Sequence, residues 1–200
     1  MKLNLLLTGN ELMAGDIIDS NSAMLAEQIK DFGWRINKKV TVGDELSILC
    51  DEIDQLCTGA DVLIINGGLG PTVDDLTAVA LAKVTNTAIA EHPEALNHLT
   101  AWCTLRGFAL NASNRKQAML PQGCEIIANA KGSAVGIKLR HRKCLVLATP
   151  GVPSELKPML ANEIIPELVT LFHSDHIKTI RLGVFGLGES AIQELVNEKL

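Results

Sequence analysis

The sequence has no tyrosine, and its two tryptophans and four phenylalanines are the only aromatic residues. It also lacks an excess of positive charge, because its formal net charge at pH 7 is −5. Proteins that bind single-stranded nucleic acid usually combine a basic groove with aromatic side chains on which the bases stack. We therefore expect no nucleic-acid partner.

Cysteine is present without any pairing pattern. The five cysteines are odd in number, scattered along the chain and set among apolar neighbours, at Cys50, Cys57, Cys103, Cys124 and Cys144. Neither a disulfide framework nor a zinc site has such spacing. We interpret them as small buried hydrophobic residues of a protein in a reducing compartment.

Long hydrophobic runs are missing as well. The apolar run at the N-terminus covers only Leu3 to Leu7 and stops at Gly9. A secretory signal and a membrane-spanning helix both need longer runs. We expect a cytoplasmic protein without a membrane partner. Its 200 residues, 47% of them hydrophobic, are enough for one well-filled core and the start of a second unit.

The most informative stretch runs from Asp61 to Thr77. Val62 to Ile65 is a β-branched and aliphatic run, typical of a strand buried on both faces. Glycines follow at positions 67, 68 and 70, and helix-forming composition begins at Asp75, with Thr72 placed to form an approximate capping box. Strand, glycine turn and helix in this order mark the place where open α/β sheets bind ligands.

Phosphate is the usual ligand of such a turn, but this one has two acids and no lysine. It is neither a phosphate-binding P-loop nor a dinucleotide fingerprint. Asp74 and Asp75 would repel a bare phosphate, whereas a divalent cation, Mg²⁺ first of all, can bridge carboxylate and phosphate oxygens. The alternative is that both acids only complement the helix dipole.

The remaining chain alternates strands and helices. Strands are predicted at Leu3 to Leu7 and Arg35 to Val42, with helices after Asp19 and from Val42 through Leu56. Helices are then expected at 92–106 and 114–119, and strands at Glu125 to Ala128, Val135 to Leu139 and Cys144 to Ala148. This order predicts an α/β fold with a mostly parallel sheet.

The last residues start a new unit. Ile177 to Phe185 is strand-like, and an amphipathic helix begins at Gly188 to Ser190. We expect a nucleotide-binding domain at 1–172, followed at 173–200 by the beginning of a small, incomplete α+β domain. This pattern favours a fragment of a longer protein.

Five motifs together resemble the N-terminal domain of the CinA (competence/damage-inducible) family. They are, in order, Thr8-Gly9-Asn10-Glu11-Leu12-x-x-Gly15-x-x-x-Asp19-x-Asn21, Val42-Gly43-Asp44, Asn66-Gly67-Gly68-Leu69-Gly70-Pro71-Thr72-x-Asp74-Asp75-Leu76-Thr77, Asn129-x-x-Gly132-x-Ala134-x-Gly136 and Pro150-Gly151-Val152-Pro153-x-Glu155. That domain is similar in fold to the molybdopterin-binding proteins MogA and MoaB. The resemblance implies a three-layer α/β/α fold.

The resemblance also implies an activity and a set of site residues. The activity is hydrolysis of ADP-ribose to AMP and ribose 5-phosphate, dependent on a divalent metal (Mg²⁺, with Mn²⁺ or Co²⁺ as alternatives) and linked to pyridine-nucleotide recycling. By motif position the catalytic acids are Asp44 and Asp75, with Asp74 as a third metal ligand. The expected nucleotide and phosphate contacts are Thr8, Gly9, Glu11, Asn21, Gly67, Gly68, Gly70, Thr72, Lys116, Gly132, Pro150 and Gly151. We also expect a homo-oligomer, a dimer or a trimer.

In this mechanism the main-chain N–H groups of the three glycines would cradle one phosphate, and Asp44 would orient or deprotonate the water. Two alternatives stay open: nucleotidyl transfer to a pterin phosphate, and a degenerate domain that only binds a nucleotide. Asn10 supports the second, because the family commonly has Asp there. The family often carries a C-terminal nicotinamide-nucleotide amidase domain, of which these residues contain nothing.

Overall fold

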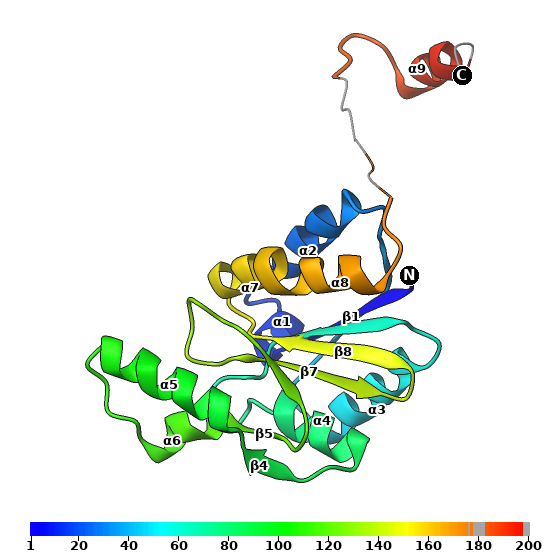
Figure 1. The fold of residues 1–200 in the computed structure, drawn as a ribbon. Coiled ribbons are helices and arrows are strands. Elements are labelled where there is room, and N and C mark those ends of the chain that lie inside the picture. Colours follow the sequence, from blue (N-terminus) through cyan, green and yellow to red (C-terminus); the bar gives the residue numbers. More distant parts are fainter. Residues whose placement is uncertain (176, 178–182, 198–200) are drawn as a thin grey trace.

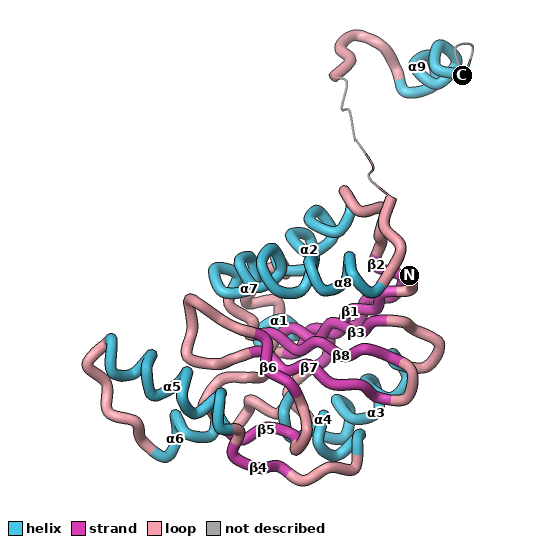
Figure 2. The backbone as a smooth tube through the Cα atoms, viewed as in Figure 1, coloured by secondary structure: helices cyan, strands magenta, loops and turns pink. Residues whose placement is uncertain are grey.

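In the computed structural model, which describes residues 1–175, 177 and 183–197, a six-stranded sheet forms the centre of the fold (Figures 1 and 2). Its strand order is β2-β1-β3-β8-β7-β6. The neighbours from β2 to β8 pair in parallel, whereas β7 is antiparallel to both β8 and β6. The strands are β1 (Leu3–Thr8), β2 (Ile36–Val42), β3 (Val62–Asn66), β6 (Glu125–Ile127), β7 (Gly136–His141) and β8 (Cys144–Thr149). The predicted, mostly parallel sheet is confirmed.

Helices cover both faces of this sheet (Figure 1). One face carries α2 (Asn21–Lys30), α7 (Pro153–Met159) and α8 (Ile165–Leu171), and the other carries α3 (Leu46–Cys57) and α4 (Thr77–Thr85). A five-residue π-helical turn, η2 (Leu160–Ile164), joins α7 to α8 between the two prolines of this stretch, Pro158 and Pro166. The three-layer prediction is therefore confirmed.

Two hydrophobic clusters, one on each face, form the core. Successive side chains of a strand point to opposite faces, so Leu5 and Leu7 of β1 join the cluster beneath α2, α7 and α8 while Leu6 joins the other. Ile64 and Ile65 of β3 divide in the same way. Burial on both faces explains why these strands are continuous apolar runs rather than alternating ones.

Some elements differ from the prediction because they are short. A separate two-stranded antiparallel sheet of β4 (Ile89–Glu91) and β5 (Met119–Pro121) was not foreseen, since three residues show no periodicity. The helix expected at 114–119 is a four-residue turn, α6 (Ala112–Arg115), followed by a 3₁₀ turn, η1 (Lys116–Ala118). The helix expected at 92–106 is α5 (Pro93–Leu105). The loop after β1 contains a short helix, α1 (Asn10–Ala14).

The end of the chain supports only part of the prediction. The helix is confirmed as α9 (Glu189–Asn197). The strand expected at Ile177 to Phe185 is not seen at Ile177 or at 183–185, and 178–182 lie outside the described residues. The segment after 172 still bonds to the main unit, since Trp34 Nε1 donates to the carbonyl of His173. The division at 172 stays a prediction.

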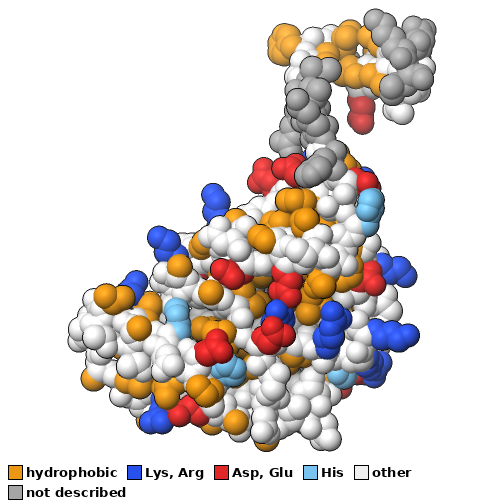
Figure 3. Space-filling model, in the orientation of Figure 1, with side chains coloured by type: hydrophobic (Ala, Val, Ile, Leu, Met, Phe, Trp, Pro, Cys, Tyr) orange, Lys and Arg blue, Asp and Glu red, His pale blue; other side chains and the backbone are white. Residues whose placement is uncertain are grey.

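Two surface features bear on possible partners. On the face shown in Figure 3, acidic and basic side chains are interspersed and form no continuous basic stripe. Among the described residues, no helix combines the length and apolar character needed to cross a membrane.

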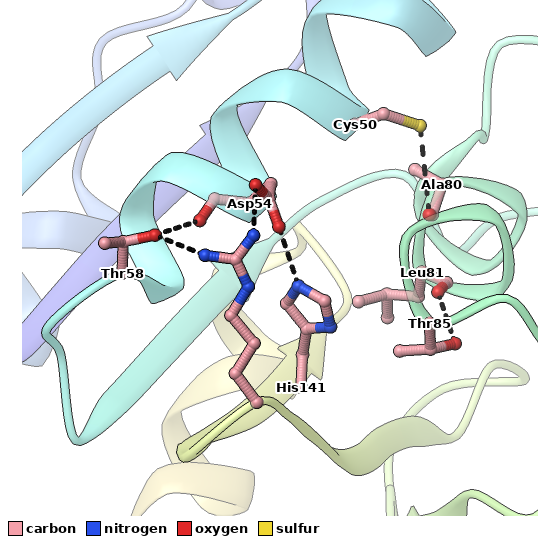
Figure 4. A network of polar contacts seen from close by, with 8 residues as sticks. Cys50, Asp54, Thr58, Ala80, Leu81, Thr85 and His141 are labelled. Carbon is pink, nitrogen blue, oxygen red and sulfur yellow. Dashed lines mark hydrogen bonds and ion pairs between the residues drawn. The ribbon is translucent and has the colours of Figure 1, made fainter.

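A polar network fastens α3 to the tip of the β7–β8 hairpin (Figure 4). The carboxylate of Asp54 lies 2.8 Å from His141 Nε2 and 2.7 Å from a guanidinium nitrogen of Arg142. Arg142 also donates to the hydroxyl of Thr58. The hydrogen bond from His141 and the charge of Arg142 together hold the pKa of Asp54 below its ordinary value, against the opposing effect of desolvation.

We expect Asp54→Asn to lower the melting temperature near pH 7 by about 1–3 °C, because solvent-screened pairs of this kind contribute up to about 1 kcal/mol. A lowered folded-state pKa stabilises the protein above the ordinary value of 3.8, and this contribution disappears as the pH falls through the lowered pKa. The difference between wild type and variant, measured by denaturant unfolding at several pH values, should therefore shrink on acidification. Asp51→Asn, an exposed change on the same helix, is the control. Equal pH dependence of wild type and Asp54→Asn would contradict the role of this network.

Candidate functional site

A cavity of about 670 Å³ opens at the carboxyl ends of β1, β3 and β8. This is where the order of strands in the sheet reverses, because the chain passes from β1 to β2 on one side and then crosses to β3 on the other side of β1. Open α/β sheets bind ligands at such a position. The loops after the three strands, together with Asp44 beyond β2, form the wall.

The structure brings most of the predicted site residues into this one cavity. Its lining includes Thr8, Gly9, Glu11, Asn21, Asp44, Gly67, Gly68, Gly70, Thr72, Asp74, Asp75, Pro150 and Gly151. Lys116 and Gly132 are not among the lining residues. Segments separated by more than a hundred residues therefore converge on one site.

Asp44 joins the loops after β1 and β2. Its Oδ1 accepts a hydrogen bond from the Thr8 hydroxyl at 2.7 Å, and its Oδ2 accepts one from the main-chain N–H of Asn10 at 3.0 Å. Asn10 reciprocates, because its side-chain oxygen accepts from the N–H of Asp44 at 3.1 Å. The residue that departs from the family pattern thus holds one of the two predicted catalytic acids in place.

Asp75 organises the glycine loop. Its Oδ1 accepts from the N–H of Gly70 at 2.7 Å, and its Oδ2 accepts from both the N–H and the hydroxyl of Thr72, at 2.8 and 2.6 Å. The predicted capping box is wrong, because α4 begins only at Thr77. The carboxylate of Asp75 thus bonds to residues of its own loop and does not cap a helix.

The three loop glycines do not all offer an N–H to a ligand, which corrects the predicted phosphate cradle. The N–H of Gly67 donates to the carbonyl of Thr149 at 2.9 Å, and that of Gly70 donates to Asp75. Within the described residues, the N–H groups of Gly68 and Leu69 make no hydrogen bond. The N–H groups that remain available to a ligand are therefore those of Gly68 and Leu69, instead of those of all three glycines.

The two predicted residues outside the lining act on the loops themselves. Lys116 Nζ donates to the main-chain carbonyls of Thr72 and Asp75, so it fixes the glycine loop from behind. Gly132 is needed for close packing, since a Cβ there would lie 2.0 Å from a carboxylate oxygen of Glu155. Neither position offers a direct phosphate contact in this arrangement.

The cavity wall is strongly acidic. Among the described residues, six carboxylates line it and no Lys, Arg or His does. They belong to Glu11, Asp19, Asp44, Asp74, Asp75 and Glu155. One of them is neutralised locally, because Asp19 lies 3.0 Å from Lys39 Nζ. An anionic ligand would be repelled here unless a cation enters with it.

These residues fit a hard divalent cation. Carboxylate, hydroxyl and amide oxygens are the ligands that Mg²⁺ prefers, and Mg²⁺ usually takes only one or two protein carboxylates together with substrate phosphates. No cluster of three or more His, Cys, Asp or Glu side chains suited to a metal occurs in the part of the chain that the structure describes. The carboxylate of Asp44 accepts two hydrogen bonds and that of Asp75 accepts three. Each carboxylate therefore has at least one lone pair left for a cation.

Some lining residues were not assigned a role from the sequence. Asn66, at the end of β3, donates to Thr149 and Pro150 and accepts from the side chain of Asn21 at 2.8 Å, so these side chains form a buried floor. Glu155 accepts from Asn129 at 2.8 Å. Asn66 and Glu155 both stand within the quoted motifs, and that position was the available signal. Gln117 also lines the cavity, and the only sequence signal for it was that it follows Lys116, a predicted site residue.

Comparison with known proteins gives consistent results. A family model described as a probable molybdopterin binding domain matches residues 4–170. A CinA-like protein of Colwellia psychrerythraea is 56% identical over 200 residues, which are 100% of this chain and 46% of that protein. A CinA-like protein of Shewanella sp. strain ANA-3 is 37% identical over 197 residues, 98% of this chain and 46% of the relative. The chain thus spans about half the length of these relatives.

Solved structures agree on the fold. The CinA protein of Thermoplasma acidophilum, whose function is described as unknown, matches with a TM-score of 0.75 and 26% identity over 82% of this chain and 96% of its own. The molybdopterin biosynthesis enzyme MoaB of Thermus thermophilus matches with a TM-score of 0.55 and 18% identity, over 85% of this chain and 94% of its own. The MoaB likeness supports the fold alone.

Gly68 offers a test of the loop geometry. It has φ +68°, and a Cβ there would lie 2.4 Å from the hydroxyl of buried Thr77. Gly59 has a similar φ of +74° with nothing within 4 Å, so Gly59→Ala isolates the backbone strain alone. We expect Gly68→Ala to cost at least about 1 kcal/mol more than Gly59→Ala in denaturant unfolding, because overpacking adds to the strain. Equal destabilisation would show that the loop yields freely around Thr77.

Proposed function

The chain belongs to the family of CinA-like proteins, and on that premise we propose that its cavity hydrolyses the diphosphate of ADP-ribose to AMP and ribose 5-phosphate. One observation carries the proposal: in the part of the chain that the structure describes, a cavity of nucleotide size is lined by six carboxylates and no basic side chain. Such a wall accepts a diphosphate only together with a cation, and metal-assisted hydrolysis needs this combination.

The acids are proposed to divide their tasks by position. Asp44 or Asp75 would offer a carboxylate oxygen to a divalent metal held mainly by the diphosphate, and this metal would neutralise the charge that develops on the diphosphate oxygens. The expected joint metal set of Asp44, Asp74 and Asp75 is not retained, because no group of three such side chains in the described residues could hold a metal. The hydrogen bonds to Thr8 and to Gly70 keep both carboxylates in fixed orientations before substrate binds. Such preorganisation avoids the cost of reorientation during the reaction.

The uncharged groups of the wall would bind and orient the nucleotide. The free N–H groups of Gly68 and Leu69 offer donors to a phosphate oxygen. The side-chain oxygen of Asn21 is buried and has no partner in the described structure, while its amide nitrogen donates to Asn66 and Gly151. A ligand hydroxyl would give this oxygen a donor after a small shift of the wall.

In the proposed reaction, water forms a bond to one phosphorus atom and the bridging P–O bond on that phosphorus breaks. The electron pair of that bond leaves with the other phosphate. AMP and ribose 5-phosphate are then the two products, whichever phosphorus is attacked.

The matching family model is described as a probable molybdopterin binding domain, and binding of such a pterin is the premise of a second candidate, transfer of a nucleotidyl group to a pterin phosphate. The same glycine loop and acids would serve it, because both reactions rearrange phosphates around a metal. The third candidate is nucleotide binding without catalysis. The hydrolase is the activity that the resemblance to the CinA family implies, and the 56% identity to a CinA-like protein supports that resemblance.

We expect purified protein to convert ADP-ribose to AMP and ribose 5-phosphate in the presence of Mg²⁺, Mn²⁺ or Co²⁺, and to stop when a chelator is added. Nucleotide chromatography of parallel incubations with ADP-ribose alone, and with ATP and molybdopterin, separates hydrolysis from nucleotidyl transfer. Calorimetric binding of ADP-ribose without AMP release in any of the three metals would overturn the hydrolase in favour of a binding domain.

Replacing Asp75 or Asp44 by Asn should lower turnover at least about 100-fold, because each change removes a negatively charged oxygen that would hold the cation facing the developing phosphate charge. Asp16→Asn is a suitable control, since Asp16 is exposed near the same rim but does not line the cavity. Turnover and melting temperature are measured together on each variant. Unchanged turnover of Asp75→Asn would remove Asp75 from the mechanism.

A further inference from the structure

The carboxylates of the cavity wall differ in how many of their oxygens are already engaged. Both oxygens of Asp44 accept hydrogen bonds from the protein, and so do both oxygens of Asp75. Both oxygens of Asp19 are engaged as well, by Ser22 and Lys39. A carboxylate that takes a proton from water needs an oxygen directed to that water rather than to a loop.

Glu155 meets this requirement. Its Oε2 accepts from Asn129 Nδ2 at 2.8 Å, and its other oxygen has no partner within the described structure. Its side chain is half-buried in the cavity wall. Glu11 and Asp74 also have unpartnered oxygens, but both residues are exposed and no side chain fixes their direction.

The partner of Glu155 is itself rigidly held. Asn129 is 1% exposed, its Nδ2 also donates to the carbonyl of Ala134, and its Oδ1 accepts the N–H groups of Lys131 and Gly132. The absence of a Cβ at Gly132 leaves the space in which the carboxylate lies. The orientation of Glu155 is therefore set by buried groups of a different loop.

We propose that Glu155 is the general base that takes the proton from the attacking water; this assignment rests on the hydrolase proposed above. As water oxygen bonds to phosphorus, one water proton passes to the free oxygen of Glu155. The P–O bond to the leaving phosphate breaks, and that phosphate departs with the electron pair. Asp44, the base expected from the sequence, is less suited, because each of its oxygens already accepts a hydrogen bond from Thr8 or Asn10 whereas one oxygen of Glu155 accepts none.

The test compares Glu155→Gln with Glu163→Gln. Gln keeps the shape of the side chain and an oxygen for Asn129, so the loop should stay in place, but it cannot take a proton. Glu163 is an exposed acid of the π-helical turn that follows α7 and does not line the cavity. For each variant, kcat with ADP-ribose and Mg²⁺, the calorimetric Kd of AMP with Mg²⁺, and the melting temperature are measured.

We expect kcat of Glu155→Gln to fall by about 10²–10⁴-fold while its Kd for AMP changes less than about threefold and Glu163→Gln behaves as wild type. If wild type hydrolyses ADP-ribose and Glu155→Gln keeps its kcat, the assignment of Glu155 is overturned and the hydrolase stands. If kcat falls together with AMP binding and melting temperature, Glu155 is structural and the assignment is equally overturned. If wild type releases no AMP, the hydrolase itself fails and the assignment fails with it.

Discussion

The site depends on hydrogen bonds from loop donors to the carboxylates of Asp44 and Asp75. Asp75 accepts three such bonds from residues 70 and 72 of its own loop, and Asp44 accepts one from the loop after β1 and one from the first strand's last residue. Bonds to an ionised acceptor are stronger than neutral ones. They make it possible to gather negative charge at one end of a sheet without a basic side chain in the cavity wall.

The floor beneath these acids is a chain of buried amides and hydroxyls. Asn21 of α2 donates to Asn66 of β3, Asn66 donates to Thr149 of β8, and Thr149 donates to the carbonyl of Ile65. Apart from the side-chain oxygen of Asn21, which has no partner in the described structure, these buried groups are paired. Such pairing favours a single arrangement, because breaking one bond leaves its partners unsatisfied in a medium of low dielectric. The floor thus ties a helix and two strands together directly below the cavity.

Some N–H groups of the glycine loop hold the loop in shape and others are available to a ligand, and the sequence alone does not tell which are which. Gly67 and Gly70 use their N–H groups within the protein, while Gly68 and Leu69 leave theirs available. Lys116, although cationic and close to the loop, donates to two carbonyls behind it. The positive charge of Lys116 therefore supports the shape of the loop, and an anionic ligand still needs a cation of its own.

The sequence by itself determined the mostly parallel sheet, and the family resemblance of its motifs implied the three layers and most of the residues that line the cavity. Continuous apolar runs such as Leu3 to Leu7 and Val62 to Ile65 have one stable placement, between two helical layers, and parallel strands bring their carboxyl ends to one edge. The short strands β4 and β5 were outside its reach because three residues show no periodicity and the two strands pair with distant residues. The start of α4 at Thr77 was missed because the carboxylate of Asp75 bonds to Gly70 and Thr72 of its own loop. Only the tertiary structure decided which donors and acceptors of the site are engaged and which are free. Hydrogen bonds such as those from Thr8 to Asp44 and from Asn129 to Glu155 join residues 26 to 36 positions apart, and no local pattern encodes the direction of a side chain that is set by a distant loop.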